Sequence, residues 1–456
     1  QWLGELWRKY HQVFVLIDEE RLQDVEREYG AGFNPFDAYP RAIVGIDLLL
    51  ANPRLTDSAV AAGIDVLIVD EAHHLRRPPG HPGNPEYRAV APIADAATHC
   101  LLLTATPLED DAHGFFRLLQ LLRPEGFDDD ASFDRHLAER RPLPPCTSAT
   151  RRVDIGGLPP RVGRPVEIDD PGGWEPVLDL ERALLAVPAT NPLEVRRKSE
   201  RLQRALAHGD ALAAILDRKE RDTGILTAMA EQAAASDPRV RWLAARARVW
   251  RDRGDKTLVF VAHRETQEAI QTALSRLAQI RVGLFHEDLS PARRDIEVAQ
   301  FRLSTGPSLL VSTECGGEGR NFEFCTRIVL FDLPWDPMVV EQRVGRLDRI
   351  GRTEPVEIRW FRPPSGLGRA VATIHERLGL FREPLGGLER ELALVPPAIE
   401  RAVADGRDDL EPDAVDVILS TADRARPDPR GRVPRAPPGP VPRRPGRRDP
   451  VRSTRT

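Results

Sequence analysis

Residues 64–74 read Ile-Asp-Val-Leu-Ile-Val-Asp-Glu-Ala-His-His, and this stretch decides the fold class. The uninterrupted apolar run at 66–69 is typical of a strand buried on both faces of a parallel sheet that helices cover. Two adjacent carboxylates, Asp70 and Glu71, follow the run. Ligands of open α/β sheets bind where parallel strands end. The stretch therefore predicts an α/β fold with two acidic side chains at the ligand-binding edge of a sheet.

Strand-like apolar runs also occur on both sides of this stretch and alternate with helix-like segments. Apolar runs alternate with helix-like segments in the first 150 residues, at 13–17, 42–46 and 100–103, and similar runs recur at 257–261, 282–285, 308–312 and 328–331. Between the two groups, Ala, Leu, Arg and Glu recur at helical spacing. We therefore expect two α/β domains with a helical insertion between them.

The expected boundaries follow from these patterns. They are 1–150 for the first α/β domain, 151–237 for a linker and helical insertion, 238–365 for the second α/β domain, 366–423 for a helical extension and 424–456 for a tail. The tail contains 11 Arg, 2 Asp and 9 Pro, a net charge of +9. So few large apolar residues cannot offset the entropy of ordering, and we expect the tail to be disordered.

The composition excludes several classes of protein. The 456 residues carry a formal net charge of −5, with 41% hydrophobic and 30% charged residues, unlike a collagenous or wholly disordered chain. No stretch approaches the roughly 18 apolar residues of a membrane span. The four cysteines form no CxxC pair, so we expect reduced thiols and a cytoplasmic location. Residues 1–423 carry −14, so any nucleic-acid site must be a local basic strip.

The first candidate functional site is the acidic pair Asp70 and Glu71. Asp70 could hold Mg²⁺, directly or through a water, because this hard cation prefers oxygen ligands. Glu71 could orient and deprotonate an attacking water. The alternative is a pair of solvated acids that begin a loop or cap a helix. The four-residue string Asp-Glu-Ala-His favours the first interpretation.

A second candidate site follows the apolar run at 100–103, where Thr104-Ala105-Thr106 precedes a proline. Its hydroxyls could bond the neighbouring carboxylates and transmit the state of a bound nucleotide. A threonine cap on a helix expected at 110–122 is the alternative.

Two further motifs lie in the second α/β domain. The stretch 312–321 ends a strand in a glycine-rich turn, which allows a backbone to approach a phosphate closely. In the stretch 341–352, Arg346 and Arg349 are three residues apart, which predicts a shared helical face. Two such guanidiniums are suited to an arginine-finger mechanism. The chain has 61 Arg and 4 Lys, so a surface arginine cluster is the alternative, above all for Arg343 and Arg352.

In this order and at these separations, the four motifs resemble those of superfamily 2 helicases and translocases of the Swi2/Snf2 group. Residues 70–73 match the DEAH motif, 104–106 the S/T-A-T motif, 313–321 the Thr-Gly-Asn motif and 342–349 the QxxGRxxR motif. Within this group, the sequence at 318–322, 331–335 and 341–351 is most similar to that of the bacterial, RNA-polymerase-associated RapA-type proteins. The resemblance covers roughly residues 1–365.

The resemblance implies two RecA-like lobes that bind ATP and Mg²⁺ and a double-stranded nucleic acid, most simply DNA. It implies that Asp70 coordinates Mg²⁺ and that Glu71 activates water. Coupling of hydrolysis to lobe movement would involve Thr104, Thr106 and Asn321.

The same resemblance assigns roles in the second lobe. Gly319 and Gln342 would contact the nucleotide, and Arg346 and Arg349 would reach its phosphates, one of them as the arginine finger. Arg293 and Arg294 are candidate nucleic-acid contacts.

One motif of such proteins is missing from these residues. No GxxxxGK[ST] loop occurs. Lys256 comes closest, in Gly-Asp-Lys-Thr, but it lacks a glycine directly before it and precedes a strand, whereas a phosphate-binding loop follows one. We therefore expect an N-terminally truncated fragment with an incomplete first lobe, which alone neither binds ATP tightly nor hydrolyses it.

The leading functional hypothesis is an ATP-dependent translocase on double-stranded DNA that remodels protein–nucleic-acid complexes, RNA polymerase being one candidate partner. A non-catalytic nucleic-acid- or polymerase-binding module derived from such a motor is the alternative. A motor acting on single-stranded RNA is a third. The codons upstream of Gln1 discriminate the first two, because only the enzyme requires a GK[ST] loop there.

Overall fold

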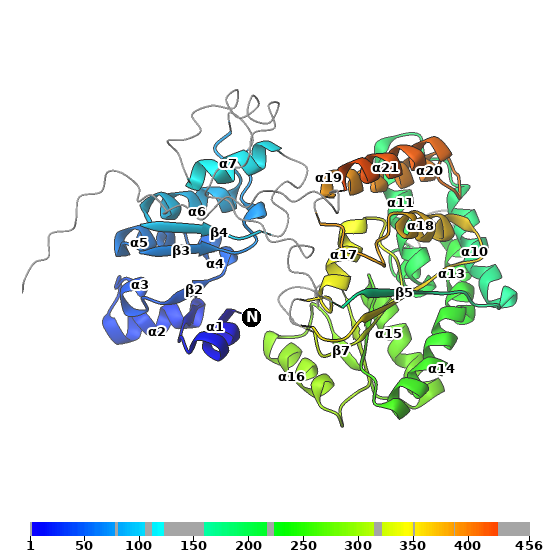
Figure 1. Cartoon of the computed structure of the whole chain (residues 1–456), viewed down its shortest axis with the longest axis horizontal. Coiled ribbons are helices and arrows are strands. Elements are labelled where there is room, and N and C mark those ends of the chain that lie inside the picture. Colours follow the sequence, from blue (N-terminus) through cyan, green and yellow to red (C-terminus); the bar gives the residue numbers. More distant parts are fainter. Residues whose placement is uncertain are drawn as a thin grey trace, which may run out of the picture. The chain divides into compact units, whose positions relative to one another are not determined.

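The computed structural model describes residues 2–77, 81–104, 112–122, 159–216, 223–313, 322–349, 352–386 and 388–426. Its described residues form two compact units, 2–122 and 159–426 (Figure 1). The predicted tail lies outside the described residues from 427 onward.

The first unit contains two pairs of parallel strands. β1 (Val15–Ile17) pairs with β2 (Ala42–Val44), and β3 (Val66–Val69) pairs with β4 (His99–Leu102). The helices that the described residues of this unit form are α1 (Trp2–Tyr10), α2 (Glu19–Tyr29), α3 (Pro35–Ala38), α4 (Ile46–Ala51), α5 (Arg54–Ala62), α6 (Pro85–Ala96) and α7 (Ala112–Leu122), and η1 (Ala72–His74) is a 3-10 turn. The strands lie where the apolar runs predict them.

Local sequence explains where several of these helices begin. Asp18, Asn34 and Asn84 precede α2, α3 and α6, and the side-chain oxygen of each accepts a hydrogen bond from a backbone N–H of the first turn. Such caps satisfy donors that have no partner inside the helix. The helix starts are therefore encoded locally, independently of the packing.

The β3–β4 pair is covered less than its apolar sequence predicts. Leu67 and Val69 pack against a cluster that includes Tyr87 and Val90 of α6. The alternate residues Val66 and Ile68 are 54% and 46% exposed. The expectation of burial on both faces is thus wrong for β3, because the described helices contribute a hydrophobic cluster to one face of this pair.

The second unit is built on a six-stranded, wholly parallel sheet in the order β5-β10-β9-β6-β8-β7. Its strands are β5 (Arg161–Val166), β6 (Thr257–Phe260), β7 (Gly283–Phe285), β8 (Leu309–Ser312), β9 (Arg327–Leu330) and β10 (Val356–Phe361). The predicted α/β class with a parallel sheet is confirmed here.

Both faces of this sheet are buried, as uninterrupted apolar strands require. In β6, Leu258 and Phe260 enter one hydrophobic cluster, whereas Val259 and the following Val261 enter the other. The second cluster includes residues of α14 (Pro238–Arg253), α15 (Arg264–Ala273) and the π-helical turn η3 (Leu274–Ala278). The first includes residues of α16 (Pro291–Arg302) and α17 (Pro337–Gly345).

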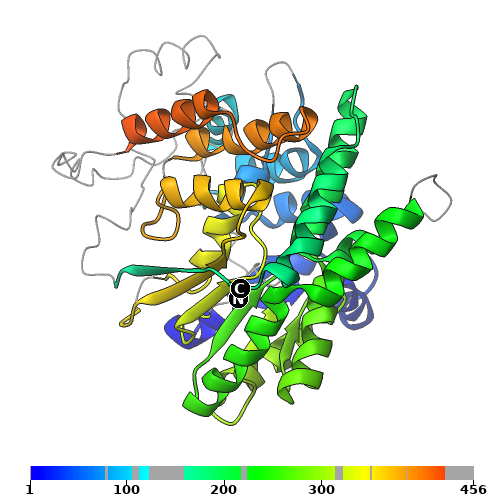
Figure 2. The ribbon, with the colours of Figure 1, turned by 90° about the vertical axis from the view of Figure 1, so that its right-hand side faces the viewer.

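A layer of helices extends the first cluster. It combines α10 (Pro171–Leu185), α11 (Pro192–Ala207), α12 (Gly209–Ala213) and α13 (Thr223–Ser236) with α18 (Gly366–Arg377), α19 (Glu389–Leu392), α20 (Val395–Ala404) and α21 (Pro412–Ala425) (Figure 2). The α10 helix packs on α13 and α18, and α11 packs on α20. Segments separated by more than 150 residues in the chain therefore share one core.

The range 151–237 contributes more than the linker and helical insertion that its composition predicts. It also supplies β5, which pairs with β10 in parallel from Arg161↔Val356 to Val166↔Phe361. The sequence conceals this strand because Pro165 and Gly163 interrupt its apolar pattern, which an edge strand tolerates. Among the described residues, no helix is both long and apolar enough to cross a membrane.

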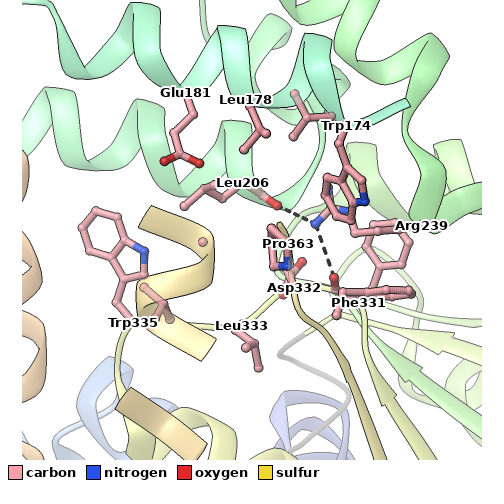
Figure 3. Close-up of a pocket in the computed structure, with 14 residues that line it drawn as sticks. Trp174, Leu178, Glu181, Leu206, Arg239, Phe331, Asp332, Leu333, Trp335 and Pro363 are labelled. Atoms are coloured by element: carbon pink, nitrogen blue, oxygen red, sulfur yellow. Dashed lines mark hydrogen bonds between the residues drawn. The ribbon is translucent and has the colours of Figure 1, made fainter. Parts of the chain in front are cut away.

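A small cavity lies between α10 and the segments that follow β9 and β10 (Figure 3). Glu181 and Leu178 reach into it from α10, and Trp335 and Leu333 lie on the opposite side. Its volume is about 40 Å³, far below the roughly 300–1,000 Å³ of small-molecule sites. The cavity has room for ordered water and not for a nucleotide.

Glu181 is the buried acid of this cavity, with 2% of its surface exposed. Its Oε1 accepts a hydrogen bond from the backbone N–H of Leu367, in the first turn of α18. Burial raises the pKa of Glu181 to about 7, against the opposing effect of this hydrogen bond. The carboxyl group is therefore protonated in the folded protein over a pH range in which it is ionised in the unfolded chain.

We predict that Glu181→Gln changes the pH dependence of stability. The folded pKa of Glu181 lies above the unfolded value, so its contribution to the free energy of unfolding falls as pH rises from about 4.5 to about 7. Glutamine does not ionise, so the free energy of unfolding of the variant does not fall for this reason as pH rises. Its stability relative to the wild type should rise by about 2–3 kcal/mol between pH 5 and pH 8.

Urea denaturation followed by circular dichroism at both pH values measures this difference. His375, whose burial lowers its pKa to about 4, affects wild type and variant equally. The exposed Glu175 on the same helix provides the control variant Glu175→Gln, for which the difference should be flat. If the stability of Glu181→Gln relative to the wild type is also the same at pH 5 and pH 8, the prediction is wrong.

Candidate functional site

Parallel pairing brings the first two predicted motifs together. Val69, the last residue of β3, lies opposite Leu102, the last residue of β4. The backbone N–H of Leu103 donates to the carbonyl of Val69, and the N–H of Ala72 donates to the carbonyl of Leu103. The segments that hold Asp70 and Thr104 are thus joined where the two strands end, as the sequence predicts.

Asp70 is exposed and accepts two hydrogen bonds. The indole N–H of Trp2 donates to its Oδ2 at 2.8 Å, and the backbone N–H of Glu71 donates to its Oδ1 at 3.1 Å. Carboxylate oxygens have further lone pairs, so these bonds orient the group and leave acceptor capacity. An exposed, oriented carboxylate of this kind fits the oxygen chemistry of Mg²⁺.

Glu71 has an unusual backbone conformation. Its φ is 51°, in the left-handed region, and it directly precedes the turn η1. A residue with a side chain adopts this region at an energetic cost, and such strain concentrates at functional positions. The side chain of Glu71 is 58% exposed.

The sequence does not identify His73 as the link between the two motifs. Its Nδ1 lies 3.3 Å from Oγ1 of Thr104 and 3.4 Å from Oε2 of Glu71. The His73 ring also packs on that of His74, with centroids 4.1 Å apart. Glu71 and Thr104 are thereby connected through one imidazole, and the position of His73 in the DEAH string was the signal available for this role.

The second group of predicted residues lies on α17 and the turn after it. The expectation that Arg346 and Arg349 share a helical face is wrong. The helix ends at Gly345, Arg346 caps it, and the N–H of Arg349 donates to the carbonyl of Leu347 in a tighter turn. Both side chains are half-buried, and Gln342 on the helix is exposed.

The contacts of Asp348 explain in part why the chain leaves the helix after Gly345. Its backbone N–H donates to the carbonyl of Val344. Its fully buried side chain forms an ion pair with Arg161, with Nε and Oδ2 2.7 Å apart. A buried carboxylate must meet its partner, and this partner lies 187 positions away in the chain.

Arg343 and Arg352 are not members of a surface arginine cluster. Arg343 is 2% exposed, and its Nη1 donates to both the carbonyl and Oδ1 of Asp332. Arg352 is 7% exposed and donates to backbone carbonyls, among them those of Cys325 and Leu347. Both residues brace the segment that contains Arg346 and Arg349.

The candidate nucleic-acid contacts lie near the start of α16. Arg293 is exposed, with its Nη2 2.9 Å from Oε1 of Glu297. Arg294 is half-buried, and its Nη2 donates to the carbonyl of Glu287 at 2.6 Å. Arg293 is therefore the more accessible of the two. The predicted Thr106, Gly319 and Asn321 lie outside the described residues.

Lys256, the nearest match to a phosphate-binding lysine, has a structural role. Its Nζ donates to the carbonyls of Leu303, Gly306 and Pro307 at 2.6, 3.2 and 2.9 Å. These three bonds use the three donors of an ammonium group. The structure thus agrees with the sequence-based exclusion of this lysine.

Two protein-family models match the chain. Residues 35–149 match the SNF2-related domain, and residues 240–351 match the helicase conserved C-terminal domain. The first match contains Asp70, Glu71 and Thr104, and the second contains Gln342, Arg346 and Arg349. The predicted motifs therefore fall within these two matches.

Curated relatives cover most of the chain. The RNA polymerase-associated protein RapA of Pasteurella multocida is 32% identical over 436 residues, which cover 85% of this chain and 44% of the relative. The protein of the same name from Stutzerimonas stutzeri is 30% identical over 460 residues, which cover 93% of this chain and 47% of the relative. The chain thus spans about half the length of the curated relatives it matches.

Solved structures are also similar to this chain. The Sulfolobus solfataricus SWI2/SNF2 ATPase core in complex with dsDNA is 17% identical, with a TM-score of 0.35, and the match covers 90% of this chain and 84% of that one. The domain matches and the curated relatives together show that the chain belongs to the Swi2/Snf2 group of helicase-like proteins.

Proposed function

We propose that this chain is the motor part of an ATP-dependent, Snf2-type translocase on double-stranded DNA. The Snf2/RapA family consists of ATP-hydrolysing, helicase-like translocases. The observation that carries the proposal is the arrangement at the end of β3, where Asp70, Glu71 and Thr104 converge within the matched SNF2-related domain. The chain spans less than half the length of these curated relatives.

Asp70 is the proposed Mg²⁺ ligand, directly or through a water. With ATP bound, the metal supplies charge neutralisation at the phosphates. The hydrogen bond from Trp2 and the N–H of Glu71 fix the orientation of the Asp70 carboxylate before any ligand arrives. Orientation in advance reduces the reorganisation that binding requires.

Glu71 is the proposed general base that orients and deprotonates the attacking water. Its exposed carboxylate can reach a water, as a base must. The contacts of His73 with Glu71 and Thr104 give a route by which a change at the carboxylate reaches the end of β4. In this proposal Thr104, with Thr106 and Asn321, couples hydrolysis to movement.

Gln342, Arg346 and Arg349 are the proposed phosphate-contacting residues of the second unit. Gly319, in the separate 313–321 motif, is a further proposed nucleotide contact. Guanidinium groups stabilise the charge that develops on a transferred phosphoryl group. Arg346 and Arg349 are both half-buried, so each keeps part of its surface accessible to an external acceptor.

The proposed partners are double-stranded DNA and a protein complex that the motor remodels, with RNA polymerase favoured by the names of the relatives. The relatives are bacterial, and we infer a cytoplasmic location. The net charge of −14 for residues 1–423 favours a local basic strip over general phosphate binding. Exposed Arg293 is a candidate for that strip.

A non-catalytic binding module is the second candidate function. It is favoured by one observation, namely the lack of a GxxxxGK[ST] loop in this sequence together with the structural role of Lys256. A binding module would retain affinity for nucleic acid or polymerase without turnover.

We predict that this chain alone does not hydrolyse ATP, because the amides and lysine of a phosphate-binding loop are the main ligands of the β- and γ-phosphates. The protein translated from the complete reading frame should hydrolyse ATP in the presence of double-stranded DNA, and Glu71→Gln should abolish that turnover. A phosphate-release assay measures both. Turnover by the short chain that Glu71→Gln abolishes would contradict the first expectation, and an inactive complete protein would favour the binding module.

We also predict that Arg349→Ala in the complete protein lowers kcat by about 10³-fold or more, as expected for an arginine that stabilises the transition state. KM for ATP should change much less, because this interaction strengthens only in the transition state. Arg276→Ala, at an exposed position in η3, is the control and should leave kcat unchanged. Equal values of kcat for Arg349→Ala and wild type would exclude the role of this arginine.

A further inference from the structure

The segment 341–349 is held from outside by one buried arginine. Arg161 is the first residue of β5, and 2% of its side chain is exposed. Its Nη1 and Nη2 donate to the two carboxylate oxygens of Glu341 at 2.8 and 2.7 Å. Its Nε donates to Oδ2 of Asp348 at 2.7 Å. One guanidinium therefore binds two acids that are seven positions apart in the same segment.

These two acids lie next to the proposed phosphate-contacting residues in the sequence. Glu341 directly precedes Gln342, and Asp348 directly precedes Arg349, with Arg346 between them. The helix α17 ends at Gly345, and the backbone hydrogen bonds to its last turn stop at Asp348, whose N–H donates to the carbonyl of Val344. The ion pair with Asp348 holds the chain at the position where it leaves the helix.

The fork of a guanidinium is essential to this arrangement. Arg161 presents three nitrogen atoms in one plane, and all three bind carboxylate oxygens. A lysine ammonium has the charge without the planar fork, so it cannot reproduce a bidentate bond to one acid and a further bond to another. Burial acts to lower the pKa of Arg161, but its bonds to Glu341 and Asp348 outweigh this effect and raise the pKa.

The same guanidinium also contacts the C-terminal part of the unit. Nη1 donates to the carbonyls of Leu380 and Glu383, each at 3.1 Å. Three segments thus meet at Arg161: the first strand of the second unit, the α17 segment and the turn after α18.

From this geometry we propose that Arg161 is the positioning residue of the arginine-finger segment. It acts through Glu341 and Asp348 to set where Arg346 and Arg349 lie, and it does not contact the nucleotide. This inference rests on the proposed function. A shift of about 1 Å in a reacting group costs on the order of 10²-fold in rate, so loosening the segment should affect catalysis well before it affects folding.

Arg327 provides a closely matched control. It is the first residue of β9 in the same sheet, its side chain is 13% exposed, and it also binds two acids, Glu357 and Asp255. Neither acid lies in the 341–349 segment. Arg327→Met therefore removes a two-acid ion pair of similar kind from the same unit without touching that segment.

The experiment uses the protein translated from the complete reading frame. We expect Arg161→Met and Arg161→Lys to lower kcat of DNA-stimulated ATP hydrolysis by about 10–100-fold, with KM for ATP changed less than about threefold. Arg327→Met should change neither value appreciably. Combining Arg161→Met with Arg349→Ala should lower kcat by less than the product of the two single losses, because part of the effect of Arg161 acts through Arg349.

Losses of kcat that multiply in the double variant, or an equal loss for Arg161→Met and Arg327→Met, would overturn the proposal. Hydrogen exchange of the same proteins, without nucleotide, tests the placement separately. The amides of 347–349 should exchange faster in Arg161→Met and not in Arg327→Met, and unchanged exchange in Arg161→Met would overturn it. If the wild type hydrolyses no ATP, the proposed function fails, whereas the exchange result still decides whether Arg161 holds the segment.

Discussion

Parallel strand pairing is the constraint on which both units depend. Because parallel strands end at the same edge of a sheet, residues that follow different strands become neighbours without being neighbours in sequence. The segments that hold Asp70 and Thr104 are brought together in this way after β3 and β4, where Thr104 contacts His73. In the second unit, Asp332 follows β9 closely and its Oδ2 accepts the backbone N–H of Ala262, just after β6. The site residues thus depend on the sheets for their placement.

Buried arginines are the second organising feature. Arg161, Arg239, Arg343 and Arg352 are each at most 7% exposed, and all four donate to backbone carbonyls. Burying a charge is costly unless its donors are satisfied, and the five donors of a guanidinium can serve several acceptors at once. In a chain with 61 Arg and 4 Lys, abundant arginine is therefore no guide to phosphate binding. The bonding of each residue decides its role.

The sequence predicts the features of this structure that neighbouring residues determine, and it does not predict those that depend on a partner far away in the chain. The strand at 66–69 follows from an uninterrupted apolar run, and the junction with Thr104 follows from the parallel pairing that such runs favour. The end of α17 at Gly345 does not follow from its sequence, because the partner of Asp348 lies in β5. The strand β5 does not stand out in the sequence, because glycine and proline interrupt its apolar pattern. The contact of His73 with Thr104 required the fold to bring the two residues together.

The left-handed conformation of Glu71 has a consequence for the evolution of this site. At φ 51°, glycine or asparagine would adopt the backbone more readily than glutamate does. Selection for stability alone therefore favours loss of the carboxylate, by about 1 kcal/mol. A lineage that no longer used the acid would be expected to drift towards glycine or asparagine here. The identity of this one residue across related genomes thus reports whether each copy still depends on the acid.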